Sequence, residues 1–131
     1  MSETLLSSRN LAFELYEVLD AEGLTQRERF AEHSRETFDA AIGTARSIAE
    51  NLFAPHNRKN DEHEPQYVDG AAVLIPEVKP AVDAFLEAGF LNATREFEVG
   101  GMQLPNLLSQ ACFAHFQSAN AATTSYPFLT M

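Results

Sequence analysis

The sequence contains few cysteines and few basic residues, and both shortages exclude classes of protein. Cys112 is the only cysteine among 131 residues, so no disulfide can form within the chain. Nine lysines and arginines stand against 19 aspartates and glutamates, which gives a formal net charge of −10. Binding to nucleic-acid phosphates or to an anionic membrane surface requires clustered basic side chains. The composition therefore argues against nucleic-acid partners and membrane-surface binding, and the acidity is best interpreted as an aid to solubility.

Long apolar runs and a targeting signal are also missing from the sequence. No apolar window approaches the length that spans a bilayer, so we expect no membrane insertion. The opening residues, MSETLLSSRN, have neither the basic start nor the apolar stretch of a signal peptide. We therefore expect a cytoplasmic protein in a reducing compartment, in which Cys112 is a small buried hydrophobe.

Several catalytic and ligand-binding motifs are absent from the sequence. It contains no GxGxxG, GxxxxGK[ST], GxSxG or HExxH, and none of its four histidines follows a glutamate at the spacing of a di-iron site. His115 is expected to be a core or interface histidine. The best set of metal-like side chains falls in residues 56–65, which lack apolar periodicity and are predicted to form a surface loop; its members are His56, Asp61, Glu62, His63 and Glu64. We predict no metal site and no catalytic residue in this chain.

The residues that are present favour one folded domain. Hydrophobic residues make up 45% of the sequence, including ten phenylalanines, which is enough to build a core. Apolar residues recur at helical spacing from Arg9 to Asp20, and a short helix is predicted from Gln26 to Glu32 with Thr25 as its N-cap. Leu11, Leu15, Val18 and Leu19, broadened by Phe13 and Tyr16, form the predicted apolar face of the first helix.

The longest predicted helix runs from Arg35 to Phe53, with Ser34 as its N-cap and Pro55 as its stop. Its Gly43 lowers helix propensity, which indicates close packing against another element. One apolar stripe is predicted along this helix, formed by Phe38, Ile42, Ala45, Ala49 and Leu52, with Ala41, Ile48 and Phe53 alongside.

The second half of the chain is predicted to contain a small extended element and two more helices. The turn pair Asp69-Gly70 beside the β-prone Val73 indicates a hairpin or extended loop near residues 67–76. A helix follows with Pro80 in its first turn and Gly89 at its end. The last helix is expected to begin near Pro105, with a tail of small residues over 118–124. The predicted fold is all-α, a helical bundle of about five to six helices with one short hairpin.

Several short motifs occur in a fixed order along nearly the whole chain. They are LAFELYEVLDAEGL at 11–24, NLFAPHN at 51–57, the Asp69-Gly70 turn leading to Pro76, FLEAGF at 85–90, GGMQLP at 100–105, and SAN followed by YPFLT over 118–130. This series resembles the N-terminal helical domain of acyl-CoA dehydrogenases, in the subgroup of long-chain and 3-methylthiopropionyl-CoA dehydrogenases. Gln103 stands where the family pattern GGxGLP has a second glycine, Val99 where an aromatic residue is usual, and Phe128 where the family has the glycine of YPGLT.

The resemblance implies an α,β-dehydrogenation of an acyl-CoA thioester that depends on FAD. In the family, a base removes the α-proton and a hydride passes from the β-carbon to the flavin, and the residues responsible lie mostly in a β-domain and a C-terminal helical domain. The resemblance therefore implies a helical extension over residues 1–24, an N-terminal-like domain over 25–131, homo-oligomer formation, and no catalysis by these 131 residues alone.

The resemblance also places the last helix beside the acyl pocket and the flavin, as part of the cleft and assembly surface. The substrate-binding candidates that it implies are Thr123, Thr124, Pro127, Phe128 and Met131. Small side chains on consecutive turns suit an acyl tail, but they suit a tight helix contact equally well. No residue is assigned to FAD.

Two other functions remain open at the level of the sequence. One is a stand-alone acidic helical module that binds a partner protein or dimerises without catalysis. The other keeps the architecture but acts on different substrates, as related flavoproteins do. The residues that would separate these functions do not lie in this stretch of sequence.

Overall fold

The computed structural model of the chain describes residues 5–131 and confirms the predicted all-α bundle with one small hairpin. The segments between the helices contain several short 3₁₀ turns, and two π-helical turns continue α1 and α2. Within the described residues, the regular elements are α1 (Ser8–Ala12), α2 (Arg35–Ile48), α3 (Asn57–Glu62), β1 (Gln66–Val68), β2 (Ala71–Val73), α4 (Val78–Glu87), α5 (Asn106–Ala119) and α6 (Ala121–Phe128).

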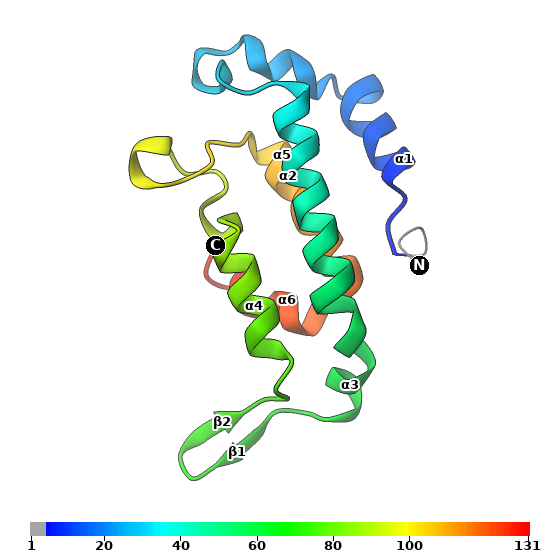
Figure 1. Cartoon of the computed structure of the whole chain (residues 1–131), viewed down its shortest axis with the longest axis vertical. Helices are drawn as coiled ribbons and strands as arrows, with labels where there is room; N and C mark the ends of the chain where they lie inside the picture. Colours follow the sequence, from blue (N-terminus) through cyan, green and yellow to red (C-terminus); the bar gives the residue numbers. More distant parts are fainter. Residues whose placement is uncertain (1–4) are drawn as a thin grey trace.

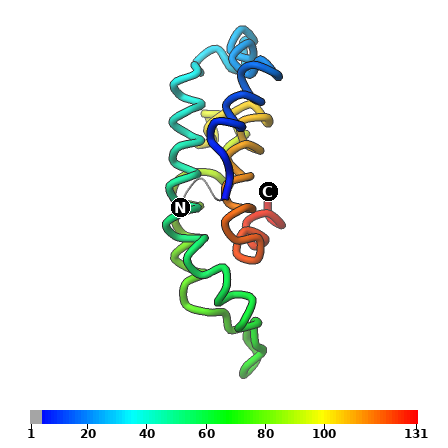
Figure 2. Tube along the Cα trace, turned by 90° about the vertical axis from the view of Figure 1, so that its right-hand side faces the viewer, coloured from blue at the N-terminus to red at the C-terminus, as the bar shows by residue number. Residues whose placement is uncertain are grey.

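The two longest helices, α2 and α5, pack along each other and form the centre of the molecule (Figure 1). Helix α4 lies beside α2, and the short α6 contacts α3, α4 and α5 near one end of the bundle. Turned by a quarter, the molecule is thin, with α2 on one side and α1, α5 and α6 on the other (Figure 2). The hairpin extends from the end of the molecule farthest from α1 (Figure 1).

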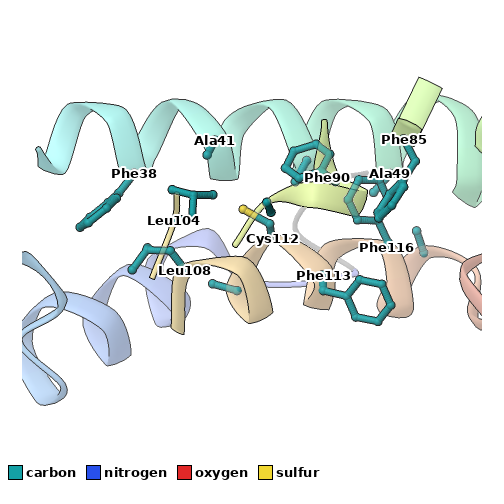
Figure 3. Packing of buried hydrophobic residues seen from close by; sticks show 14 of the residues in the cluster. Phe38, Ala41, Ala49, Phe85, Phe90, Leu104, Leu108, Cys112, Phe113 and Phe116 are labelled. Carbon is teal, nitrogen blue, oxygen red and sulfur yellow. The ribbon is translucent and has the colours of Figure 1, made fainter. Parts of the chain in front are cut away.

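Phenylalanine rings fill the interface between these helices, as the high phenylalanine content predicts (Figure 3). Phe116 of α5 lies at the centre, with ring centroids 4.9 Å from Phe85 and 5.0 Å from Phe53. Cys112 is buried in the same cluster, where desolvation raises the pKa of its thiol to about 12. The thiol is therefore an unreactive core group, as predicted.

Helix α2 begins as predicted but changes its winding before it ends. The Ser34 hydroxyl accepts the Thr37 backbone N–H at 3.3 Å, and the Thr37 hydroxyl accepts the Ser34 N–H at 2.9 Å, which together make a capping box. A π-helical turn, Ala49–Phe53, then adds a residue to the last turn and shifts the register. Phe53 consequently faces the core, while Leu52, which the α-helical stripe placed inward, is 40% exposed.

Gly43 does not have the close neighbour that its position in α2 indicated. A Cβ atom built on it meets nothing within 4 Å. The residue lies on the exposed face of α2, so the prediction of close packing there was wrong.

The hairpin and the end of α4 follow the predicted turn chemistry. Asp69 and Gly70 both have positive φ, 49° and 82°, as a type I′ turn requires, and Val68 pairs with Ala71 across it. Gly89 ends α4 with a φ of 87°. The strands β1 and β2 are exposed along their whole length, so they add nothing to the core.

The N-terminal region departs from the prediction in two ways. The predicted helix from Arg9 to Asp20 is present as α1 and a π-helical turn, Phe13–Val18, but only Leu15 of its apolar face is buried, while Phe13, Val18 and Leu19 are exposed. The predicted helix over residues 26–32 is replaced by 3₁₀ turns, Ala21–Gln26 and Glu28–Phe30. Thr25 does not cap a helix, because its hydroxyl donates to the Glu22 carbonyl at 2.7 Å.

Two further corrections concern polar segments. Residues 56–65 are not a plain loop, since α3 forms there and is held through polar contacts: Asn60 binds Thr123 and Lys59 binds Glu77. The small-residue tail over 118–124 does not continue α5. Asn120 adopts an extended conformation, with φ −165° and ψ 92°, and begins the separate helix α6.

Candidate functional site

Helix α6 carries most of the predicted substrate-binding residues, and its position is set by Asn120. The Asn120 side-chain oxygen accepts the Thr123 backbone N–H at 3.0 Å, which is an N-cap, and its amide donates to the Phe53 carbonyl at 3.0 Å. Asn120 is 1% exposed, so this cap is an internal part of the fold. The cap fixes which α6 residues face inward and which face outward.

Thr123, Thr124 and Pro127 face inward and are buried. The Thr123 hydroxyl lies 2.7 Å from His56 Nε2 and 2.7 Å from Asn60 Nδ2. The Thr124 hydroxyl donates to the Phe116 carbonyl at 2.9 Å. Both hydroxyls are therefore already used within the chain, and they hold α6 against α3 and α5.

Phe128 and Met131 face outward at the other end of α6 and are about half exposed. Both line a cavity of about 530 Å³, which Phe113 of α5 also lines. The Phe128 and Phe113 rings lie 5.5 Å apart, so they form a continuous apolar floor. The structure thus separates the five candidates into an inner group of three and a cavity-lining pair.

The opposite wall of the cavity comes from residues 91–96, from Arg29 and from the first turns of α5. Arg29 donates to the Thr94 carbonyl at 3.2 Å and pairs with Glu96 at 3.1 Å. Hydrogen bonding to the Glu96 backbone and then to Arg29 lowers the pKa of the Glu96 carboxyl. The cavity therefore has an apolar floor and a polar rim, which suits a ligand with an apolar part and a polar part.

Sequence reasoning missed the polar residues of this cavity. Arg95, Asn106, Ser109 and Gln110 line it together with Arg29, and no motif marks any of them. Arg29 and Glu96 are 67 positions apart, and no local pattern indicates that they meet. Only the fold of the 91–104 segment against α5 brings these residues together.

Gln103, the main departure from the family pattern, supports this segment. Its φ is +50°, a left-handed conformation that is unstrained for glycine but strained for glutamine. The side chain spans the corner: its amide donates to the Arg29 carbonyl at 2.7 Å, and its oxygen accepts the Phe97 N–H at 3.2 Å. Gly101 beside it is required sterically, because an added Cβ would lie 2.1 Å from the Arg95 carbonyl oxygen.

Other groups that drew attention in the sequence have structural surroundings. His115 is buried in α5, and desolvation, followed by the charge of Arg46, lowers its pKa. Among residues 5–131, no group of three or more histidine, cysteine or acidic side chains is placed to hold a metal ion. No helix in this part of the chain is long and apolar enough to cross a membrane.

Comparison with known proteins finds a similarity to an acyl-CoA dehydrogenase. The chain is 27% identical over 128 residues to the broad-specificity linear acyl-CoA dehydrogenase FadE5 of Mycobacterium tuberculosis. The match covers 96% of this chain and 21% of that enzyme, so the chain spans about a fifth of the relative's length. No family model matches the chain, and no solved structure gives a significant match.

The similarity to FadE5 supports the resemblance to acyl-CoA dehydrogenases noted from the motifs. It runs through nearly the whole chain. It does not distinguish the long-chain and 3-methylthiopropionyl-CoA subgroup from other members of the family.

Proposed function

We propose that this chain is the N-terminal helical domain of an FAD-dependent acyl-CoA dehydrogenase and forms part of its acyl/flavin cleft and assembly surface. The observation that carries the proposal is the similarity to FadE5 over 96% of the chain. A helical fold with a cavity beside the predicted residues is compatible with this role. Residues 1–24 would be a helical extension, and residues 25–131 the domain itself.

In this proposal the five predicted residues build one wall of the substrate site at two depths. Phe128 and Met131 present apolar surface to the cavity, where an acyl chain would lie. Thr123, Thr124 and Pro127 form the layer behind them and keep α6 in place. Direct contact of the two threonines with substrate stays a prediction, since their hydroxyls bond within the chain.

The FAD and the catalytic base are proposed to lie in the remaining domains. The sequence has no glycine-rich dinucleotide motif, and we assign no flavin contact to the residues described. FAD would supply the acceptor for the hydride when bound in the whole enzyme. The 131 residues alone are proposed to be inactive and cytoplasmic. They are also proposed to self-associate, because apolar side chains at the end of α6 are exposed.

A flavin-retention experiment on the 131-residue chain tests whether FAD binding requires the remaining domains. The purified chain is mixed with FAD, desalted, and examined for absorbance near 450 nm, with circular dichroism as the check that it is folded. We expect a helical protein without bound flavin and without dye reduction when acyl-CoA is added. Stoichiometric retention of FAD by the folded chain would overturn the proposal that it is one domain of a larger flavoenzyme.

A pair of neighbouring substitutions tests the proposed wall in the polypeptide that carries the remaining domains. Phe128 lines the cavity, whereas Leu129, next in sequence, is 82% exposed and does not. We expect Phe128→Ala to change the ratio of kcat/KM between long and short acyl-CoA substrates, and Leu129→Ala to leave it unchanged. Equal ratios in both variants would remove Phe128 from the proposed substrate site.

The alternative of a stand-alone interaction module is favoured by the exposed apolar residues of the N-terminal segment. Phe13, Val18 and Leu19 are each at least half exposed, and a partner protein or a second copy would cover them. The discriminating observation is the coding sequence beyond residue 131. A continuation into a β-rich segment supports the dehydrogenase, and a stop codon favours the module.

A further inference from the structure

A buried polar cluster joins α6 to α3 and to the end of α2. Its members are His56, Asn60, Asn120 and Thr123, and three of them are at most 3% exposed. Two Asn60 contacts, 2.7 Å to the Thr123 hydroxyl and 3.2 Å to the Asn120 side-chain oxygen, link the segments. The Asn120 amide also donates to the carbonyl of Phe53, the last residue of the π-helical turn that ends α2.

The hydrogen-bond pattern is compatible with a neutral histidine, and we assign the ring that state. The Thr123 hydroxyl oxygen accepts an amide proton from Asn60, and we assign its own proton to His56 Nε2, 2.7 Å away. Nε2 then acts as the acceptor and carries no proton. In this tautomer the second ring nitrogen carries the proton. With this assignment, the Nε2–Thr123 hydrogen bond forms while the imidazole is neutral.

Protonation of His56 would place a donor opposite the Thr123 O–H. The hydroxyl would lose its acceptor in the cluster, and a positive charge would be buried. Charged side chains nearby are Lys59 of α3 and Glu77 at the start of α4, which bind each other at 2.6 Å. Helix α6 has no charged residue in its sequence, AATTSYPF. Nothing on α6 therefore offsets a charge on the ring, and Glu77, which favours the charged ring, is already paired with Lys59.

We propose that His56, Asn60, Asn120 and Thr123 form a proton-sensitive latch that holds α6 on α3 while His56 is neutral and releases it on acidification. Because α6 carries Phe128 and is followed by Met131, release would move one wall of the cavity; that consequence rests on the proposed function. The latch itself does not, and its test needs neither flavin nor substrate.

The test uses NMR on the 131-residue chain to measure both the tautomer of the His56 ring and the amide hydrogen exchange of α6. Nitrogen shifts of His56 at pH 7.5 are expected to show the Nδ1–H tautomer. Amide hydrogen exchange, corrected for its intrinsic pH dependence, is then compared between α6 and α5. If a released His56 titrates near 6.5, the opening of α6 becomes about tenfold more favourable between pH 7.5 and 5.5.

Two variants separate the latch from general destabilisation. Thr123→Val keeps the shape but removes the hydroxyl, and should abolish the pH response of α6; Thr123→Ser should retain it. His63→Gln, an exposed histidine next to α3, is the matched control and should leave the response unchanged. An Nε2–H tautomer in the unmodified chain, or equal α6 protection at both pH values, would overturn the latch even if Thr123→Val fails to fold.

Discussion

At the scale of single residues, Gln103 shows how a side chain can replace a glycine. Its left-handed backbone costs about 1–2 kcal/mol for a residue with a Cβ, and its two side-chain hydrogen bonds to residues 29 and 97 offset that cost. Gln103→Ala keeps the backbone cost and loses the bonds, while Gln103→Gly loses the bonds but removes the cost. We expect Gln103→Ala to be less stable than Gln103→Gly by about 1 kcal/mol in urea unfolding. Equal stability of the two variants would show that the corner is not strained.

Gly43 gives the opposite case, a glycine that the fold does not need. It lies in the middle of α2 with open space around its Cα, so a methyl group meets nothing. Gly43→Ala should raise the free energy of unfolding by up to about 1 kcal/mol through helix propensity. Gly101→Ala is the matched contrast and should be strongly destabilising, since its Cβ would overlap the Arg95 carbonyl. Thermal unfolding of both variants checks the pair, and a destabilised Gly43→Ala would reveal a contact that the structure lacks.

At the scale of elements, the start of α2 is the clearest local stability determinant. Ser34 and Thr37 exchange side-chain and backbone hydrogen bonds across the first turn. Ser34→Ala should therefore cost about 1 kcal/mol of unfolding free energy, whereas Ser34→Asp, which keeps an acceptor, should cost less. Urea denaturation compares the two variants. An Ala variant as stable as the parent would mean that packing against α5 alone fixes this helix end.

The elements also show what could be predicted from the sequence and why the rest could not. Apolar periodicity and caps identified α2, α4 and α5, because burial of one face decides those helices. The same reasoning failed for α3, whose contacts with α6 and α4 are polar and come from Asn60 and Lys59. It also failed at Leu52, which it placed on the apolar stripe, since the π-helical turn leaves Leu52 exposed and Phe53 buried.

The candidate site was only partly accessible to the same reasoning. Small residues and the family resemblance drew attention to α6, but its division into an inner and an outer group depends on the Asn120 cap. Asn120 occurs inside a run of small residues that reads as one continuous helix. The polar rim of the cavity depends on a contact between residues 29 and 96, and no local signal predicts a contact over that distance along the chain.

At the scale of the whole molecule, stability should fall as the pH drops below about 6.5. Burial is the main cause that lowers the pKa of both His56 and His115, so unfolded chains bind protons at a pH where the folded chain does not. The contribution of each neutral histidine to the free energy of unfolding is fully present above its pKa in the unfolded chain. That contribution is lost as the pH falls toward the lower pKa that the histidine has in the folded chain. Each histidine contributes at most about 1.4 kcal/mol per pH unit over that window.

Urea unfolding at pH 7.5, 6.5 and 5.5 checks this dependence. His115→Gln should flatten the curve, and His63→Gln should run parallel to the parent, which removes the general effect of the net charge. The carboxyls of Glu36, Glu77 and Glu96 have lowered pKa values, so their contribution is lost only below about 4.5. Stability that stays constant between pH 7.5 and 5.5 would contradict the assignment of two buried neutral histidines.

We propose that the whole molecule is one part of a flavin-dependent acyl-CoA dehydrogenase. The most direct measurement is the visible spectrum of the natural polypeptide that contains this sequence, purified from its source and titrated anaerobically with acyl-CoA. We predict flavin absorbance near 450 nm that is bleached on addition of substrate, with one flavin per chain. A natural polypeptide that binds no flavin, or whose flavin is not reduced by any acyl-CoA, would contradict the claim.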